Sequence, residues 1–154
     1  MIQRVQSIYL LIIVILSCQM LFFPLFEFTS RDGQIFSFTF TGIRTTDSDP
    51  ARIIQPLLQV TILIPVTGFI SLVCIFLYKK RRIQMWLSLI NFILIVVFVI
   101  LVFLFTSRFT GNIFSDIHPC LVGVFPLIEI ILSYMAYLRI KADENLVRSY
   151  DRLR

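Results

Sequence analysis

Charge is what this sequence has least of along most of its length. Only 15% of its 154 residues are charged, and four stretches of 22 to 26 residues contain no Asp, Lys or Arg. These stretches are residues 5–26, 53–78, 83–107 and 117–138. A helix of about 20 predominantly apolar residues crosses the hydrocarbon layer of a membrane, and a charge at its centre is costly. The sequence therefore predicts one all-α integral membrane domain over residues 1–154, a four-helix transmembrane bundle, and excludes a soluble domain.

Motifs that would support catalysis or metal binding are also missing. Cys18, Cys74 and Cys120 lie singly in apolar runs with no CxxC pair, which indicates small apolar side chains rather than redox or metal ligands. His118 is the only histidine, and a metal site needs three or four convergent donors. The chain has no Ser/His/Asp arrangement, HExxH motif or Gly-rich phosphate loop. We therefore predict a protein that is not an enzyme, with no catalytic residue, cofactor or metal.

Positive charge is present, and it is distributed unevenly. Four spans place both termini on one side, together with the basic tetrad between spans two and three. The tetrad consists of Lys79, Lys80, Arg81 and Arg82. That side holds ten of the fourteen Lys and Arg residues, and short basic loops remain cytoplasmic. The net charge of +5 is thus a topology signal, with the tetrad setting orientation or contacting anionic lipid. The lipid bilayer is the partner this predicts, and no nucleic acid is needed.

The outer loop, residues 27–52, carries a strand pattern. Its phenylalanines at positions 36, 38 and 40 alternate with Ser and Thr, which is the period of a strand with one apolar face. We expect a small extracytoplasmic β-hairpin that pairs Phe28 with Phe38 and Phe26 with Phe40 around a three-residue loop, Asp32-Gly33-Gln34. A two-residue Asp32-Gly33 turn would instead place Phe28 opposite Ser37.

Two segments resemble each other in sequence. Residues 28–37 match residues 105–115 with one insertion, and Ile54-Gln55-Pro56 is echoed by Ile117-His118-Pro119. The similarity is open to two interpretations, a true duplication of a two-helix unit or chance similarity between Phe/Thr/Ser-rich boundaries.

The cytoplasmic tail, residues 139–154, is charged but keeps a helical apolar spacing. We expect it to continue span four as an amphipathic C-terminal helix. It would then lie along the inner interface of the membrane or dock a cytoplasmic partner.

One ionisable residue lies within a span. Glu129 is near the middle of span four, and such a group faces the bundle interior and is a functional hypothesis by default. Asn91 and Ser71 lie at a similar depth by chain count. A protonated Glu129 donating to Asn91 or Ser71 would give a neutral network, which burial favours. The alternative is a proton- or cation-coupled site, so these three residues form the candidate intramembrane polar site.

Both ends of the chain resemble a known family. The opening residues 1–11, MIQRVQSIYLL, and the closing residues 141–154, KADENLVRSYDRLR, are similar to the bacterial four-span membrane proteins grouped as domain of unknown function 4293. The resemblance implies an inner-membrane protein of Gram-negative bacteria. It implies no activity and supplies no catalytic residues.

These observations favour a non-enzymatic assembly or accessory subunit of the bacterial inner (cytoplasmic) membrane. Such a protein would form a homo-oligomer or join a larger membrane complex. The alternative from another class is a proton- or ion-linked carrier or channel built around Glu129. A membrane enzyme is the least favoured, because the inner boundary offers bases without an acid/base pair near a nucleophile.

Overall fold

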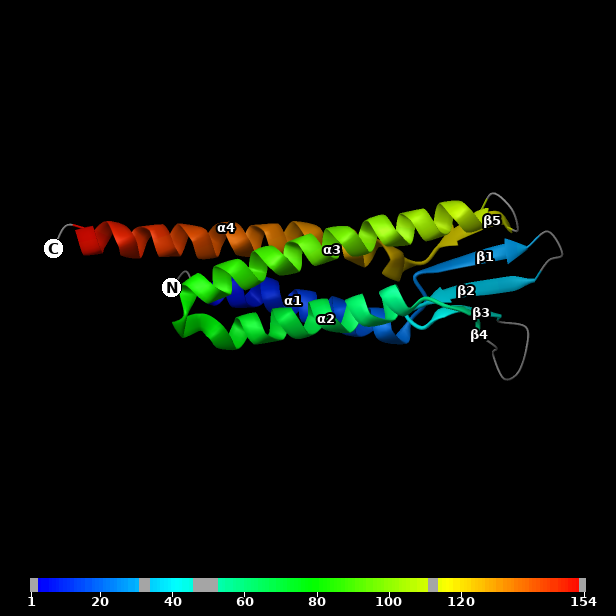
Figure 1. Cartoon of the computed structure of the whole chain (residues 1–154), viewed down its shortest axis with the longest axis horizontal. Coiled ribbons are helices and arrows are strands. Elements are labelled where there is room, and N and C mark those ends of the chain that lie inside the picture. The colour runs from blue at the N-terminus through cyan, green and yellow to red at the C-terminus, as the bar shows by residue number, and fades with distance from the viewer. Residues whose placement is uncertain (1–2, 31–33, 46–52, 111–113, 153–154) are drawn as a thin grey trace.

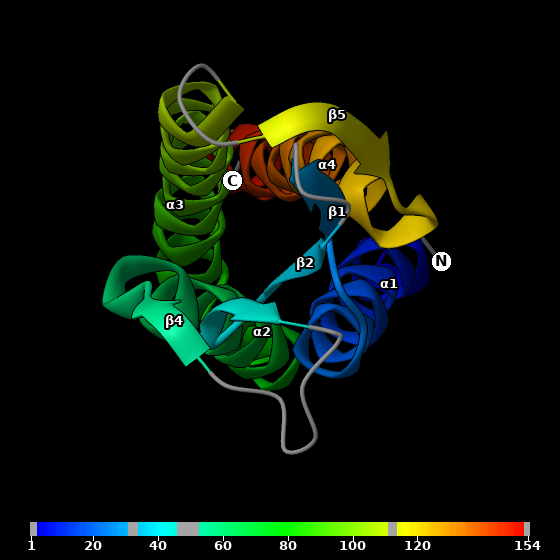
Figure 2. The same ribbon diagram turned by 90° about the vertical axis from the view of Figure 1, so that its right-hand side faces the viewer.

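The computed structural model describes residues 3–30, 34–45, 53–110 and 114–152, and it is dominated by four long helices. The helices are α1 (Gln3–Phe22), α2 (Leu58–Phe76), α3 (Arg81–Thr110) and α4 (Phe125–Arg152). They lie roughly side by side, and a small β-sheet extends from one end of the bundle (Figure 1). Viewed from that end, the helices form a ring in which α1, α2, α3 and α4 follow one another (Figure 2).

Both termini lie at the end of the bundle opposite the sheet, as does the short connection between α2 and α3 (Figure 1). This connection is a 3-10 turn, η1 (Leu77–Lys79), followed directly by α3. The basic tetrad and the two termini therefore share one end of the molecule, which we call the inner end. The end that carries the sheet is called the outer end.

Three helical segments are long and apolar enough to cross a membrane. They are Leu58–Phe76, Arg82–Ser107 and Leu121–Leu146. The apolar part of α1, Gln6–Phe22, is shorter than these three. The prediction of four long apolar helices is thus confirmed for three of them, and α1 completes the bundle as a shorter fourth.

The sheet is larger than the hairpin that the sequence predicts. Its strands are β1 (Phe26–Ser30), β2 (Ile35–Thr39), β3 (Gly42–Thr45), β4 (Ile53–Pro56) and β5 (Phe114–Pro119). They form one antiparallel sheet in the order β4-β3-β2-β1-β5. The last strand, β5, comes from the connection between α3 and α4, so the sheet joins the two halves of the chain.

Two predicted spans therefore begin too early. Residues 53–56 and 117–119 lie in edge strands, and their helices begin only at Leu58 and, after a 3-10 turn η2 (Leu121–Val124), at Phe125. Hydropathy alone could not separate these segments from the helices, because a short apolar run fits a strand as well as a helix. The prolines at positions 56 and 119 each end a strand, which agrees with the preference of proline for sheet edges.

The predicted hairpin exists, but its register is wrong by two residues. Phe28 lies opposite Phe36 and Phe26 opposite Phe38, while Ser30 donates its backbone N–H to the carbonyl of Gln34 over 2.8 Å. Residues 31–33, which include Asp32 and Gly33 of the predicted loop, lie outside the described residues. A shift of two residues keeps every side chain on its face, and for this reason the alternation of phenylalanines could not distinguish the two registers.

The first helix also ends earlier than the predicted span over residues 5–26. It stops at Phe22, and Phe26 already belongs to β1. Pro24 lies between the two elements, and proline cannot continue a helix because it lacks the backbone N–H.

The two similar sequence segments differ in structure in their first parts, whereas residues 36–37 and 114–115 are both in strands. Residues 28–30 form a strand, whereas residues 105–107 are helical. The prolines at 56 and 119 are equivalent in one respect, because each closes an edge strand that leads into the next helix. The similarity of the first parts is therefore not a structural repeat.

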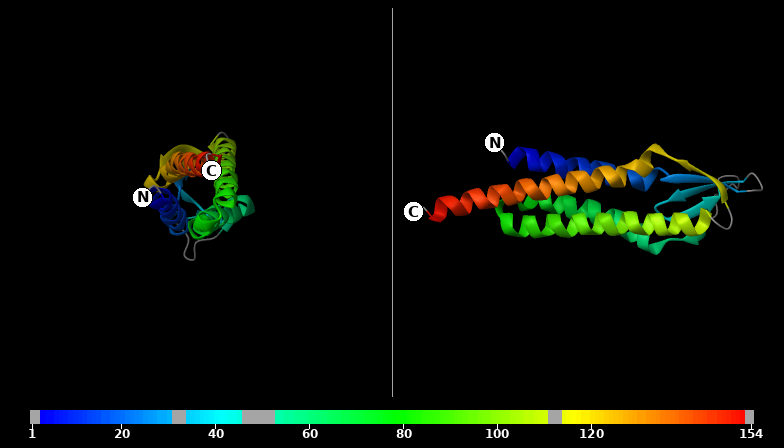
Figure 3. Two further views of the ribbon diagram at one scale, coloured as in Figure 1. Left: turned by 90° about the vertical axis from the view of Figure 1, so that its left-hand side faces the viewer. Right: turned by 90° about the horizontal axis from the view of Figure 1, so that it is seen from above.

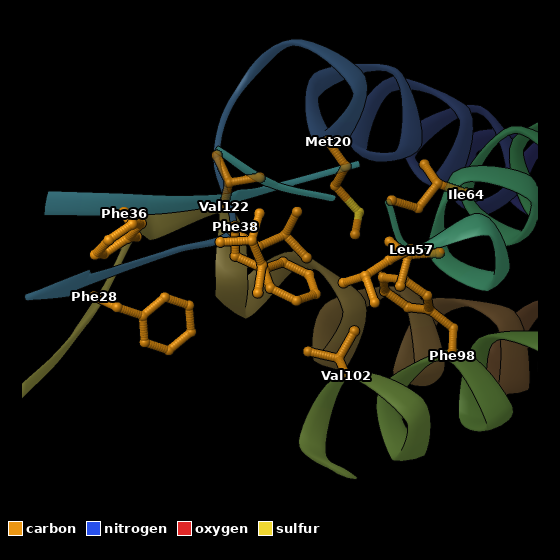
Figure 4. Packing of buried hydrophobic residues seen from close by; sticks show 12 residues of the cluster. Met20, Phe28, Phe36, Phe38, Leu57, Ile64, Phe98, Val102 and Val122 are labelled. Carbon is orange, nitrogen blue, oxygen red and sulfur yellow. The ribbon is translucent and has the colours of Figure 1, made fainter. Parts of the chain in front are cut away.

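The outer apolar cluster packs the sheet against the helices (Figure 4). Phe28, Phe36 and Phe38 project from the sheet toward Leu57 and Phe98 of the helical region. Phe38 makes edge-to-face contacts with Phe26 and Phe28 at centroid distances of 6.3 and 6.5 Å. Aromatic pairs of this kind contribute about 0.5–1.5 kcal/mol beyond their buried area.

The inner apolar cluster is smaller and lies nearer the termini. Its buried members are Leu10, Ile13, Cys74 and Ala136, which come from α1, α2 and α4. On α1 and α2, residues between the two clusters therefore have buried apolar side chains toward both ends of the bundle.

The predicted tail helix is part of α4. The helix runs from Phe125 to Arg152 without interruption, so the tail continues span four as expected. It does not turn to form a separate interfacial helix. Instead α4 extends past the inner ends of the other three helices (Figures 1 and 3).

Candidate functional site

Between the two apolar clusters, all four helices place polar side chains inward at a similar level. We call this set the central polar layer. Its members are Ser17, Thr67, Ser71, Ser88, Asn91, Glu129 and Ser133. Each of them is at most 4% exposed. The prediction that Glu129 faces the interior is confirmed, since its exposed fraction is 2%.

Glu129 is held by a residue that the sequence did not indicate. Ser17 of α1 donates its hydroxyl to Glu129 Oε1 over 2.8 Å, which links α1 to α4. Ser17 also lies close to Gly68 of α2: a Cβ placed on that glycine would be 3.2 Å from the Ser17 Cβ. Gly68 therefore allows α1 to approach α2 closely while Ser17 reaches α4.

The other two predicted site residues bind each other. Asn91 Nδ2 donates to Ser71 Oγ over 2.9 Å, which links α3 to α2. The expected hydrogen bond from Glu129 to Asn91 or Ser71 is thus replaced by two separate pairs. Counting positions along the chain placed these groups at the right depth, but it could not show which faces of the four helices meet.

Three oxygen atoms of the layer have no hydrogen-bond partner among the described residues. They are Ser88 Oγ, Asn91 Oδ1 and Ser133 Oγ. A buried polar atom that lacks a partner costs about 1–3 kcal/mol. The layer therefore has capacity to accept further hydrogen bonds near its centre.

On α1 and α2, apolar side chains flank the central polar layer in the direction of both ends. On α1, Leu10 and Ile13 precede Ser17 and Met20 follows it. On α2, Ile64 and Cys74 flank the polar positions in the same way. On α3, by contrast, the buried side chains that follow Asn91 toward the inner end are polar, first Ser88 and then Gln84.

A second polar group closes the inner end. Gln6 of α1 donates its side-chain amide to Asp143 of α4, and both residues are buried. Gln84 of α3 donates to the backbone carbonyl of Cys74 over 3.1 Å, so it satisfies a carbonyl in the last turn of α2.

The basic tetrad contacts the same region. Arg82 Nε lies 3.3 Å from Glu144 Oε1, and the arginine side chain is 72% exposed. An exposed pair of this kind is worth at most about 1 kcal/mol. Lys80 is exposed at the end of the α2–α3 connection, while the side chains of Lys79 and Arg81 lie outside the described set. Among the described side chains of the tetrad, Lys80 is thus exposed and Arg82 contacts α4.

Within the described residues, no group of three or more His, Cys, Asp or Glu side chains could hold a metal ion. The three cysteines are unpaired thiols: Cys18 is exposed, Cys74 buried and Cys120 half-buried.

Some of the missed residues had a detectable signal. Ser133 follows Glu129 by four positions and Ser88 precedes Asn91 by three, so each shares a helical face with a predicted site residue. Ser17, Gln6 and Gln84 had no such signal, because their role depends on which helices are neighbours.

The architecture defines a class of protein: a helical bundle with three membrane-length apolar helices, a buried polar layer and a five-stranded sheet at one end. A family model described as a domain of unknown function, DUF4293, matches residues 2–153. The chain belongs to this family, as the resemblance of its two ends implied. We found no match among curated proteins.

The pairing of Ser17 with Glu129 can be measured by a double-mutant cycle. We expect Ser17→Ala, Glu129→Leu and the double variant to give a coupling of about 0.6–1.7 kcal/mol, the range found for hydrogen bonds between membrane helices. Thermal or denaturant unfolding in detergent gives the free energies.

Ser17→Ala combined with Asn91→Leu is the matched control, because these residues belong to different pairs. Its coupling should be close to zero. Equal coupling in both cycles would contradict the pairing of Ser17 with Glu129.

Proposed function

We propose that the protein is a non-enzymatic assembly or accessory subunit of the bacterial inner membrane that crosses the bilayer four times. Three helices with sufficient length and hydropathy support this proposal, and α1 adds a fourth helix of 20 residues. At 1.5 Å per residue, 20 residues measure about 30 Å, which matches the hydrocarbon layer. The shorter apolar stretch of α1 is therefore long enough once its end residues lie at the interface.

The distribution of side chains on the bundle supports membrane insertion as well. Large apolar residues are exposed on the lateral surface of every helix, for example Ile8, Phe69, Phe103 and Ile131. Polar residues such as Asn91 and Glu129 are instead buried. This arrangement suits a lipid environment, in which apolar side chains face outward and polar groups are paired inside.

The orientation we propose places the inner end, with the basic tetrad, in the cytoplasm. Positively charged short loops are retained on that side. The five-stranded sheet would then lie on the outer face of the membrane.

Cysteine labelling tests this topology. In a background without native cysteines, a cysteine at the exposed Gln34 should react with an impermeant maleimide added to intact spheroplasts. A cysteine at the exposed Lys80 should react only after permeabilisation. Lys80 serves as the inner probe because it is exposed, whereas the nearby Gln84 is only 3% exposed. Labelling of Lys80 in sealed spheroplasts, with Gln34 protected, would overturn the orientation.

The main support for the assembly role is the inner end of α4, which protrudes beyond the other helices. Asp143 and Glu144 mark the level at which the other helices end, because they contact Gln6 near the start of α1 and Arg82 near the start of α3. The helix continues for eight residues from Glu144 to Arg152, which corresponds to about 12 Å. This segment extends beyond the bundle (Figures 1 and 3).

A helical end of two turns has little stability by itself, because short helices in water are marginal without packing. Docking against a partner at the inner face would supply that packing. The partner is either a second copy of this chain or another subunit of a membrane complex. The hydrogen bond from Ser17, which joins Glu129 of α4 to α1, favours an architectural role for Glu129.

Site-specific photo-crosslinking tests the docking role. A photoreactive residue at the exposed Asn145 should give a single protein adduct in membranes, formed in proportion to the chain. The matched control is Ile131 on the same helix, which is exposed on the lateral surface and should react mainly with lipid.

The mass of the adduct distinguishes a second copy from a different subunit. Removal of residues 147–154 should abolish partner assembly, measured as complex mass in detergent, while the bundle remains folded. Lipid adducts alone at Asn145 would contradict a docking role and support an end that lies free at the membrane surface.

A proton- or ion-linked site at Glu129 is the second candidate. The observation in its favour is the set of unpaired oxygens, Ser88 Oγ, Asn91 Oδ1 and Ser133 Oγ, in the same layer as the carboxyl group. We expect Glu129→Gln to fold like the wild type in both cases, because it retains shape and hydrogen-bonding capacity.

A complementation assay distinguishes an architectural role of Glu129 from a proton-linked site. If Glu129 is architectural, the Gln variant complements a deletion strain and Glu129→Leu lowers thermal stability. A stable Gln variant that fails to complement would instead favour the proton-linked site, since an amide cannot titrate.

A further inference from the structure

An apolar cavity opens on the side of the bundle near its outer end. Its volume is about 440 Å³, within the ~300–1,000 Å³ of ligand sites in proteins. The lining residues come from α3, from the start of β1 and from the η2–α4 junction. They are Leu25, Phe26, Phe98, Val99, Val102, Phe103, Thr106, Gly123, Val124, Pro126 and Leu127.

The cavity exists because two neighbouring helices begin and end at different levels. At the outer end of the bundle α3 continues to Thr110, whereas α4 begins only at Phe125 and is preceded by the narrower turn η2. The outer turns of α3 therefore face η2 and β1 instead of a full helix. Gly123 lines the cavity at a point where η2 approaches Leu25 closely, since a Cβ on this glycine would lie 2.6 Å from the carbonyl oxygen of Leu25.

The chemistry of the lining selects an apolar occupant. Thr106 is the only lining residue with a polar side chain. At the mouth, Phe103, Val124 and Leu127 are exposed, so the wall of the cavity continues into the lateral surface of the bundle. An occupant can therefore enter from the lipid that surrounds the side of the bundle.

A transmembrane helix fits the cavity less well than a hydrocarbon chain does. A helix about 10 Å wide with a pitch of 5.4 Å fills roughly 420 Å³ per turn, so the whole cavity equals one turn. A helix from a partner could insert one or two side chains but could not bury its backbone. A flexible hydrocarbon chain is thinner and can enter along its length.

The depth of the cavity also fits a lipid. If α3 enters the hydrocarbon layer near Ile83, about 20 residues place the outer boundary near Phe103. The cavity is lined by α3 from Phe98 to Thr106, so it lies across that boundary. A lipid chain inside it would have its head group at the level of the sheet.

We propose that this cavity binds one acyl chain of a bilayer phospholipid from the outer leaflet. The proposal rests on the membrane insertion put forward above, but not on the assembly role. The hydrophobic effect does not favour a chain in the cavity over a chain in the bilayer, because the surrounding lipid tails are as apolar as the cavity. Binding instead comes from close packing that fills a void, together with the restricted exit of a chain held between α3 and η2.

Phospholipid retained by the purified full-length protein is the measurement. After extensive washing in mild detergent, the wild type should keep one phospholipid per chain, quantified by extraction and mass spectrometry. Leu127→Trp fills the mouth of the cavity and should lower retention by about tenfold. Ile131→Trp is the matched control, four residues further on the same exposed face of α4, and should retain lipid like the wild type.

A second pair protects the test against a folding defect. Val99→Trp occupies the cavity from α3, whereas Val97→Trp adds the same bulk to an exposed position of α3 outside the lining. Thermal unfolding and gel filtration report whether each variant is folded. Loss of lipid in both cavity variants but in neither control supports the site.

Three results would overturn the proposal: no retained lipid in the wild type, retention unchanged in both cavity variants, or equal loss in the controls. The last two would indicate lipid bound around the whole bundle. The cysteine labelling described above is independent of this measurement. If the protein inserts as proposed but retains no lipid, only the acyl-chain site is contradicted. If the labelling pattern differs from the expected one, the membrane topology itself is contradicted.

Discussion

The burial of one carboxyl group constrains how the four helices can pack. Glu129 is 2% exposed in the second turn of α4, where an unpaired polar group is costly because it is buried. Ser17 relieves this cost by donating to Oε1, but only if α1 lies against α4 at one level. That level also brings Ser17 against Gly68, whose missing side chain lets α1 and α2 approach. One hydrogen bond and one glycine thus fix α1 relative to two neighbours.

The positions of the two apolar clusters follow from this alignment. With Ser17 at the level of Glu129, the outer part of α1 joins the aromatic cluster under the sheet, and the inner part joins Cys74 and Ala136. The second pair, Asn91 with Ser71, holds α3 against α2 at a similar depth. Polar pairs between apolar layers specify which helix faces meet, since apolar packing alone tolerates rotation and sliding. This arrangement is the physical basis for assigning the layer an architectural role.

Features that could serve other molecules lie at the ends of the bundle, away from the central layer. At the inner end α4 extends past its neighbours and is joined to them by the contacts of Asp143 and Glu144. At the outer end, the late start of α4 leaves the cavity beside α3. Both features come from the position of α4 along the bundle, since it begins only at Phe125 and continues to Arg152.

The sequence by itself determined the apolar helices, the inward position of Glu129 and the presence of strands in residues 27–52. Each of these depends on local composition or periodicity: long uncharged runs, a single intramembrane carboxylate, and phenylalanines with a period of two. The family was also accessible from the two ends of the chain, and residues 2–153 match its model.

Only the tertiary structure decided which side chains and which strands pair with each other. The bond from Ser17 to Glu129 joins residues 112 positions apart, and the pairing of β1 with β5 joins the two halves of the chain. Neither leaves a local pattern, because each depends on which helices are neighbours and how they are rotated. The hairpin register shows the same limit, since a shift of two residues preserves the alternation while Phe28 changes partner from Phe38 to Phe36. Periodicity specifies the face of a side chain, and packing in three dimensions specifies what that face meets.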